Sequence, residues 1–306
     1  MVPHLAEVAL RNKTLAWLLE FNNPSARYLT LTKVLDRSEE TQEVRDSRAA
    51  IPQAAPARDI LLAQYPQGYW MHPGIGCSPR YRATLWQILI LAQLGMPRCP
   101  AVDRAVDHLF EANQREDGAF RASKEPGDVP MGLNGSLLWA LERLGYGEAT
   151  AVERAWSWLA GEIETHGLES RGVGRESPTQ GAVKVLWAAN AVPPNRRYGG
   201  LELVSREAAA FLLDASPDRR DGETIWSRLT FPLTEGADLL QWMAVLVDAG
   251  YGDDPRLAPA RSWLAPKRRP DGAWPLERVP GKLWADVGAL DEPNKWVTIR
   301  ALAVSL

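Results

Sequence analysis

The chain has 306 residues, of which 45% are hydrophobic and 24% charged, and its formal net charge is -3. This composition can form a sizeable core and excludes a disordered chain. The small negative charge and the lack of a Lys/Arg run give no basis for a nucleic-acid partner.

The first 56 residues show helical patterns over 3–22 and roughly 27–50, followed by Pro52 and Pro56. Because proline stops or bends a helix, we expect 1–56 to form an N-terminal helical preface to the rest of the chain. The charged residues among the first 21 suit an amphipathic helix better than a signal peptide. No apolar stretch approaches the roughly 18 to 20 residues of a membrane span. We therefore expect a cytoplasmic protein, and we leave peripheral membrane contact open.

A repeated motif dominates the middle of the chain. Gln-x-x-x-Gly-x-(Trp/Phe) runs from Gln64 to Trp70 and again from Gln114 to Phe120, and a degenerate copy runs from Arg268 to Trp274. The glycines of the series are Gly68, Gly118, Gly167, Gly222 and Gly272, at intervals of 50, 49, 55 and 50 residues. So regular a period indicates an array of structural repeats.

Each interval between these glycines predicts a pair of antiparallel helices. The segment from Leu141 to Gly147 reappears as Leu246 to Gly252: an apolar run ends at a glycine suited to a helix C-terminus, a short turn follows, and apolar residues then recur at helical spacing. The first helices of the pairs, which we expect to be inner, begin near Arg80, Leu133, Thr179, Thr234 and Pro293. The outer helices are expected near 102–113, 150–163, 201–214 and 256–266.

These patterns predict an all-α fold in a single domain over 1–306, an α/α toroid built from about five to six helix-pair repeats with ten to twelve helices. In such a closed ring we expect the starts of the inner helices to line the central mouth. Thr84, Asn134 and Gln180 occupy equivalent early positions in three of those helices.

The motif and the helix-pair period resemble the prenyltransferase and squalene/hopene cyclase repeat superfamily, whose members form α/α toroids. Four further segments resemble a single-domain bacterial branch of it: Asn23 to Tyr28, Tyr81 to Gln87, Leu133 to Gly135 and Asn294 to Thr298. The resemblance covers nearly the whole chain and implies the fold. That branch has no established reaction, so the resemblance implies no particular activity for this chain.

Departures from the resembled family exclude its best-known chemistry. The chain has neither the Asp-x-Asp-Asp motif of class II terpene cyclases nor an Asp-Asp-x-x-Asp motif, and Asp253-Asp254 is better read as a helix cap. Zinc would need a Cys/His cluster, yet His72, Cys77 and Cys99 have no further paired ligands nearby in the sequence. With only two cysteines, we do not expect a disulfide framework. We expect no metal and no cofactor.

Thirteen tryptophans are the most distinctive feature of the composition. Trp70, Trp158, Trp263 and Trp274 occupy repeat positions, where they would join neighbouring units. Five more fall within the predicted inner helices, and we expect about half of these to face a central cavity: Trp86, Trp139, Trp187, Trp242 and Trp296. An aromatic-walled cavity suits a hydrophobic ligand, terpenoid or polycyclic, whereas a packed core is the competing interpretation.

Acids in apolar surroundings are the catalytic candidates. Asp238 lies between two apolar runs and is the preferred proton donor, with Asp286 as the substitute, although Asp238 could equally cap a helix. The expected substrate contacts are Tyr81, Trp86, Asn134, Gln180, Trp226, Trp242 and Trp296.

The sequence thus predicts a terpene-cyclase-like protein that binds a hydrophobic small molecule and, if it is an enzyme, catalyses acid-assisted cyclisation or isomerisation without metal. Whether it is an enzyme stays open. The alternatives are a non-catalytic toroid that binds lipid or protein, and a carbohydrate-active α/α toroid.

Overall fold

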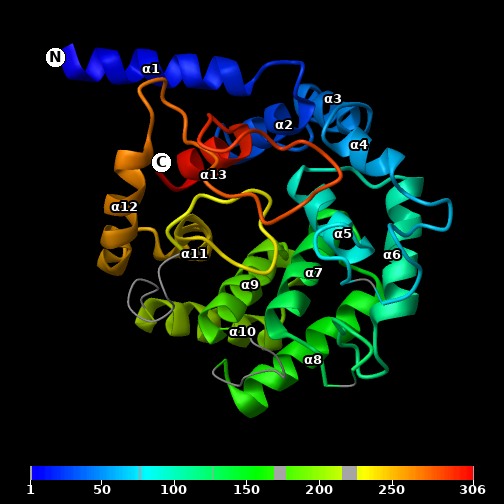
Figure 1. The fold of residues 1–306 in the computed structure, drawn as a ribbon. Helices are drawn as coiled ribbons and strands as arrows, with labels where there is room; N and C mark the ends of the chain where they lie inside the picture. Colours follow the sequence, from blue (N-terminus) through cyan, green and yellow to red (C-terminus); the bar gives the residue numbers. More distant parts are fainter. Residues whose placement is uncertain (1, 76, 126, 169–176, 216–225, 306) are drawn as a thin grey trace.

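The computed structural model describes residues 2–75, 77–125, 127–168, 177–215 and 226–305, and within them the protein is all-α. These ranges contain thirteen α-helices, and the only strand-like pairing within them is in isolated bridges (Figure 1). The helices are α1 (Val2–Leu18), α2 (Pro24–Lys33), α3 (Gln42–Ala50), α4 (Ala57–Leu62), α5 (Thr84–Gln93), α6 (Pro100–Asn113), α7 (Met131–Arg143), α8 (Thr150–His166), α9 (Pro178–Ala191), α10 (Gly199–Asp214), α11 (Leu239–Leu246), α12 (Ala258–Leu264) and α13 (Lys295–Ser305). The predicted fold class is confirmed.

The helices alternate between buried and half-buried. Every residue of α5 is buried, as expected for a helix that is apolar on all sides. Its successor α6 buries only one stripe, formed by Val102, Ala105, Val106 and Leu109. The same pairing recurs in α7 with α8, α9 with α10, and α11 with α12. Helices α6, α8, α10 and α12 lie close to the ranges predicted for the outer helices.

The buried helices pack in a closed order. Helix α5 contacts α7, and contacts continue from α7 to α9, α11, α13 and α2. Between α2 and α5, Ser25 Oγ donates a 2.8 Å hydrogen bond to the Leu94 carbonyl, and the Tyr28 ring leaves no room for a side chain at Gly95. Figure 1 shows these six helices around the centre, with α6, α8, α10 and α12 outside them. The all-α class is thus shown, and the closed α/α toroid stays a prediction.

The glutamine of the repeated motif connects its own turn to the start of the next outer helix through hydrogen bonds. Gln64 Nε2 donates to the carbonyls of Gly68 (3.1 Å) and Ala101 (2.9 Å). Gln114 repeats this with Gly118 and with Ala151 at the start of α8. At Gly118, φ is +100°, and a Cβ would lie 2.4 Å from the Arg154 carbonyl oxygen. Glycine is required there by both conformation and space.

The third copy of the motif keeps the turn and replaces the glutamine. Arg268 Nε donates to the Gly272 carbonyl at 3.3 Å, and Gly272 has φ +85°. Gly118 and Gly272 thus share the positive φ of the turn. The aromatic residues that end the motif are all buried, namely Trp70, Phe120 and Trp274. Gly222 lies outside the described residues.

The N-terminal segment is helical, as expected, but it does not precede the ring. Helix α2 packs on α13 and so belongs to the inner helices. Helix α1 lies against the last repeat, where Thr14 and Leu10 approach Gly272 and Arg268 pairs with Glu7 at 2.6 Å. Among the described residues, no helix is both long enough and apolar enough to cross a bilayer.

Candidate functional site

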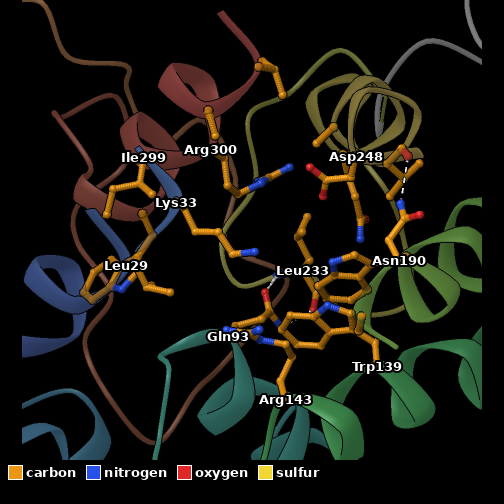
Figure 2. A pocket seen from close by; sticks show the side chains of 18 of the residues that line it. Leu29, Lys33, Gln93, Trp139, Arg143, Asn190, Leu233, Asp248, Ile299 and Arg300 are labelled. Atoms are coloured by element: carbon orange, nitrogen blue, oxygen red, sulfur yellow. Dashed lines mark hydrogen bonds between the residues drawn. The ribbon is translucent and has the colours of Figure 1, made fainter. Parts of the chain in front are cut away.

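A cavity of about 210 Å³ lies among the inner helices. Its wall comes mainly from α2, α7, α9, α11 and α13, and a loop that contains Phe231 and Leu233 closes one side. Figure 2 shows side chains from these separate elements converging on the same space. Each inner helix contributes residues of one face, because a helix in a ring can present only one stripe to the centre.

Two stacked aromatic pairs form much of the apolar wall. Trp139 of α7 and Trp187 of α9 stack with ring centroids 3.7 Å apart, and both indoles are half-buried. Phe231 and Trp296 stack with centroids 4.9 Å apart. Three of the five inner-helix tryptophans, namely Trp139, Trp187 and Trp296, line the cavity, close to the expected half. Their ring faces offer a surface for apolar groups and for cations.

Most polar side chains of the cavity come from the last turns of the inner helices, and Gln241 and Arg300 are the exceptions. Gln93, Arg143 and Asp248 each stand two residues before a helix-closing glycine, and Lys33 and Asn190 lie in the last turns of α2 and α9. Gln93 is occupied in both directions, since it accepts from Leu233 N and donates to Leu233 O, each at 2.7 Å. It therefore anchors the loop over the cavity.

Asp248 lies just after α11, in a π-helical turn over Val247–Tyr251. A carboxylate at a helix C-terminus opposes the helix dipole, and π-turns occur often at functional sites. Burial raises the pKa of Asp248 above its ordinary value, and the charges of Lys33 and Arg143 lower it only in part. No hydrogen bond or ion pair to its carboxyl group is found within the described part of the chain. This acid is thus held in the cavity wall with its protonated form favoured.

Lys33 and Arg143 face Asp248 across the cavity. Burial lowers the pKa of Lys33, the charge of Arg143 lowers it further, and the charges of Asp248 and Glu39 act in the opposite direction. Arg143 lies 4.0 Å from Glu39, at the limit of an ion pair. Figure 2 shows Lys33, Arg143 and Asp248 entering the cavity from three different helices. The polar end of the cavity therefore holds two cations and one acid.

Asp238 does not face this cavity. It is fully buried at the N-cap of α11, where its carboxylate accepts from Thr230 N (2.8 Å) and Gln241 N (2.7 Å). Arg300 donates to both carboxylate oxygens, at 2.5 and 3.2 Å. The helix-cap interpretation is confirmed, and an acceptor so fully occupied has no free proton to donate to a ligand. We do not retain Asp238 as the proton donor.

Asp286 is exposed in the loop before α13, and its side chain accepts a 2.8 Å hydrogen bond from Gly288 N. It does not line the cavity either. Asp254 caps the short helical turn that follows it by accepting from Arg256 N, as the sequence indicated.

Of the predicted substrate contacts, Trp296 lines the cavity and the others do not. Asn134 is fully buried and binds Phe120 N, Phe120 O and Pro130 O. Gln180 binds the backbone of Ala237. The remaining aromatic residues pack elsewhere. Tyr81 packs against Trp86, whose Nε1 donates to the Cys77 carbonyl. Trp242 Nε1 donates to the Leu212 carbonyl, and Trp226 is buried in the segment before α11.

The expectation that inner-helix starts line the cavity is therefore corrected. Thr84 and Asn134 accept from the backbone N–H of Trp70 and Phe120, 14 residues earlier in each case, so these early positions hold the repeat turns. The cavity instead takes most of its polar groups from the opposite ends of the inner helices, with Gln241 of the first turn of α11 as an exception. The sequence carried a signal for this, because the residue two before the closing glycine is polar in three of the inner helices: Gln93, Arg143 and Asp248.

The buried acid predicts a measurable pH dependence. The folded protein binds the Asp248 proton more tightly than the unfolded chain does, so the free energy of unfolding falls as the pH rises from 3.8 through the raised pKa. Asn carries no charge at any pH. We expect Asp248→Asn to gain stability over the wild type at pH 8 and to lose that gain towards pH 4, measured by urea titration at both pH values.

Asp253→Asn, on the exposed turn next to α12, removes the same charge from the surface and serves as the control. An Asp248→Asn protein that is less stable than the wild type at pH 8 would show that the carboxylate is favoured there, contrary to the prediction.

In the described residues, no three His, Cys, Asp or Glu side chains gather as metal ligands would. Comparison of the chain with known protein families finds no match, and comparison with curated proteins finds none either.

Proposed function

We propose that the protein binds a compact hydrophobic molecule, terpenoid or polycyclic, in the central cavity. The observation that carries this proposal is the wall formed by the Trp139–Trp187 and Phe231–Trp296 stacks around unfilled space. Apolar pockets with a few convergent polar groups are the usual form of small-molecule sites. The sequence resemblance to the prenyltransferase and squalene/hopene cyclase repeat superfamily agrees with such a ligand, and we propose that the protein acts in the cytoplasm.

The volume of the cavity narrows the ligand class. An engineered apolar cavity of about 150 Å³ holds one benzene ring. A space of about 210 Å³ therefore suits a molecule of one or two rings, or a short isoprenoid, and is too small to enclose a triterpene.

Acid-assisted cyclisation or isomerisation is the reaction that this site would support, with Asp248 in the role first given to Asp238. A protonated Asp248 would transfer its proton to an alkene carbon, and the carboxylate would later take a proton back from the carbocation, so that the acid is regenerated. The indole faces of Trp139 and Trp187 would stabilise the intermediate charge.

Thermal-shift screening tests the binding proposal. Borneol and geraniol should raise the melting temperature by a few degrees when present at about 100 times the dissociation constant, because binding then adds about 2.7 kcal/mol. Trp139→Ala should lose most of this shift, whereas Trp158→Ala, on the outer helix α8, should keep it. Stabilisation by glucose, nucleotides or zinc without a response to the hydrophobic compounds would overturn the proposal.

The same screen separates the alternatives. A response to sugars alone would favour a carbohydrate-active protein. Binding without chemical change to the ligand, checked by mass spectrometry after long incubation, would favour a carrier of lipid-like molecules.

A further inference from the structure

The cationic side chains around the cavity differ in whether a nearby carboxylate balances their charge. Arg300 is matched by Asp238, with which it forms a bidentate pair. Arg143 has only the distant Glu39, 4.0 Å away, and no ion pair of Lys33 is found in the described residues. Asp248 is the one acid among the lining residues. Two cationic side chains, Lys33 and Arg143, therefore face a single acid at the end of the cavity formed by the last turns of α2 and α7.

An amide donor in the wall of the cavity has no partner. Gln241 is 2% exposed and lines the cavity from α11. Its Oε1 accepts a 2.9 Å hydrogen bond from Lys184 Nζ, which settles the orientation of the amide. Its Nε2 is then left without an acceptor. A buried N–H without a partner is costly, so a ligand oxygen that reaches it after a small shift of the amide would be recognised.

Gln241 and Asp248 are seven residues apart along one helix and its closing turn. At 1.5 Å per residue, the two positions are separated by about 10 Å along the helix axis. Lys33 and Arg143 therefore lie at one end of the cavity and the Gln241 amide at the other. The stacked indoles of Trp139 (α7) and Trp187 (α9) form part of the cavity wall.

We propose that the ligand is a hydrophobic anion, a molecule with one carboxylate or phosphate group held between Lys33 and Arg143, an apolar body against the tryptophan pair, and an acceptor oxygen at Gln241 Nε2. This inference rests on the proposed function, since it names the class of molecule that the same cavity binds. A charged group in a partly buried site gains more from such contacts than it would in water.

Calorimetric titration at pH 7 with one skeleton in three charge states tests the headgroup. The probes are 2-naphthoate, 2-naphthalenemethanol and the cation of 2-naphthalenemethylamine, with 2-naphthyl phosphate as the second anion. We expect naphthoate or the phosphate to bind about 10 to 100 times more tightly than the alcohol, and the cation to bind most weakly. The better of the two anions identifies the headgroup.

Variants assign the effect to residues. Lys33→Gln should weaken naphthoate binding about tenfold and leave the alcohol unchanged, while Lys282→Gln, in an exposed loop, should change neither. In the wild type, 6-acetyl-2-naphthoate should bind more tightly than naphthoate. Gln241→Glu, which keeps the acceptor for Lys184 and removes the free N–H, should abolish that advantage.

The outcomes separate this inference from the proposed function. If the alcohol binds as tightly as the anions, or if Lys33→Gln weakens both equally, the anionic ligand is refuted while a hydrophobic site remains. If Lys33→Gln does not fold, the order of the three wild-type affinities alone decides. If no probe binds at all, both proposals fail.

Discussion

Asp238→Ala is expected to destabilise the protein by about 3 to 5 kcal/mol, the range for removing one partner of a buried ion pair. The substitution leaves Arg300 inside the protein without its carboxylate, and the side chain of Arg300 is only 18% exposed. It also removes the acceptor for Thr230 N and Gln241 N, and with the latter the N-cap of α11. Urea titration followed by circular dichroism measures the change.

Two further variants test whether the loss of stability comes from the ion pair. Asp286→Ala, the other acid first considered for catalysis, is exposed and should cost about 0.5 kcal/mol or less. The double variant Asp238→Leu/Arg300→Met replaces both charges with apolar side chains and should recover part of the loss. A loss below about 1 kcal/mol in Asp238→Ala would mean that the ion pair contributes little to the fold.

Trp274→Ala is expected to cost about 3 to 5 kcal/mol, the usual range for removing a buried aromatic side chain. Trp274 is 4% exposed, and its Nε1 donates to the Leu264 carbonyl at the end of α12. Its backbone N–H donates to Thr298 Oγ1 in α13, so the residue joins the last outer helix to the last inner helix. The loss of free energy of unfolding is again measured by urea titration.

Phe21→Ala is the matched control, because that ring is 84% exposed and the variant should change stability by about 0.5 kcal/mol or less. If Trp274→Ala cost no more than this control, the repeat aromatic would not hold neighbouring helix pairs together. The prediction for the whole series of buried motif aromatics would then be wrong.

Much of the fold could be read from the sequence because its signals are local. The Gln64 and Gln114 motifs bind a carbonyl four residues on, and the glycine between needs a positive φ that few other residues adopt. Helix pairs follow from apolar spacing over a single turn. The period of about 50 residues then predicted how the pairs repeat, and the structure agrees over the described ranges.

The chemistry of the cavity depended on contacts between residues far apart in the chain. The sequence correctly indicated that Asp238 could cap a helix. Its pairing with Arg300, 62 residues away, could not be foreseen, and this pairing keeps the carboxylate as a hydrogen-bond acceptor. Lys33, Arg143 and Asp248 come from three helices, and each looks in isolation like an ordinary charge at a helix end.

The sequence by itself determined the helices, their pairing and the residues of the turns, because these depend on neighbours within a few positions. Only the tertiary structure decided which ends of the inner helices meet at the cavity and which charges remain uncompensated there. Those properties depend on how each helix is rotated in the ring, and that rotation is set by the packing of all six inner helices together.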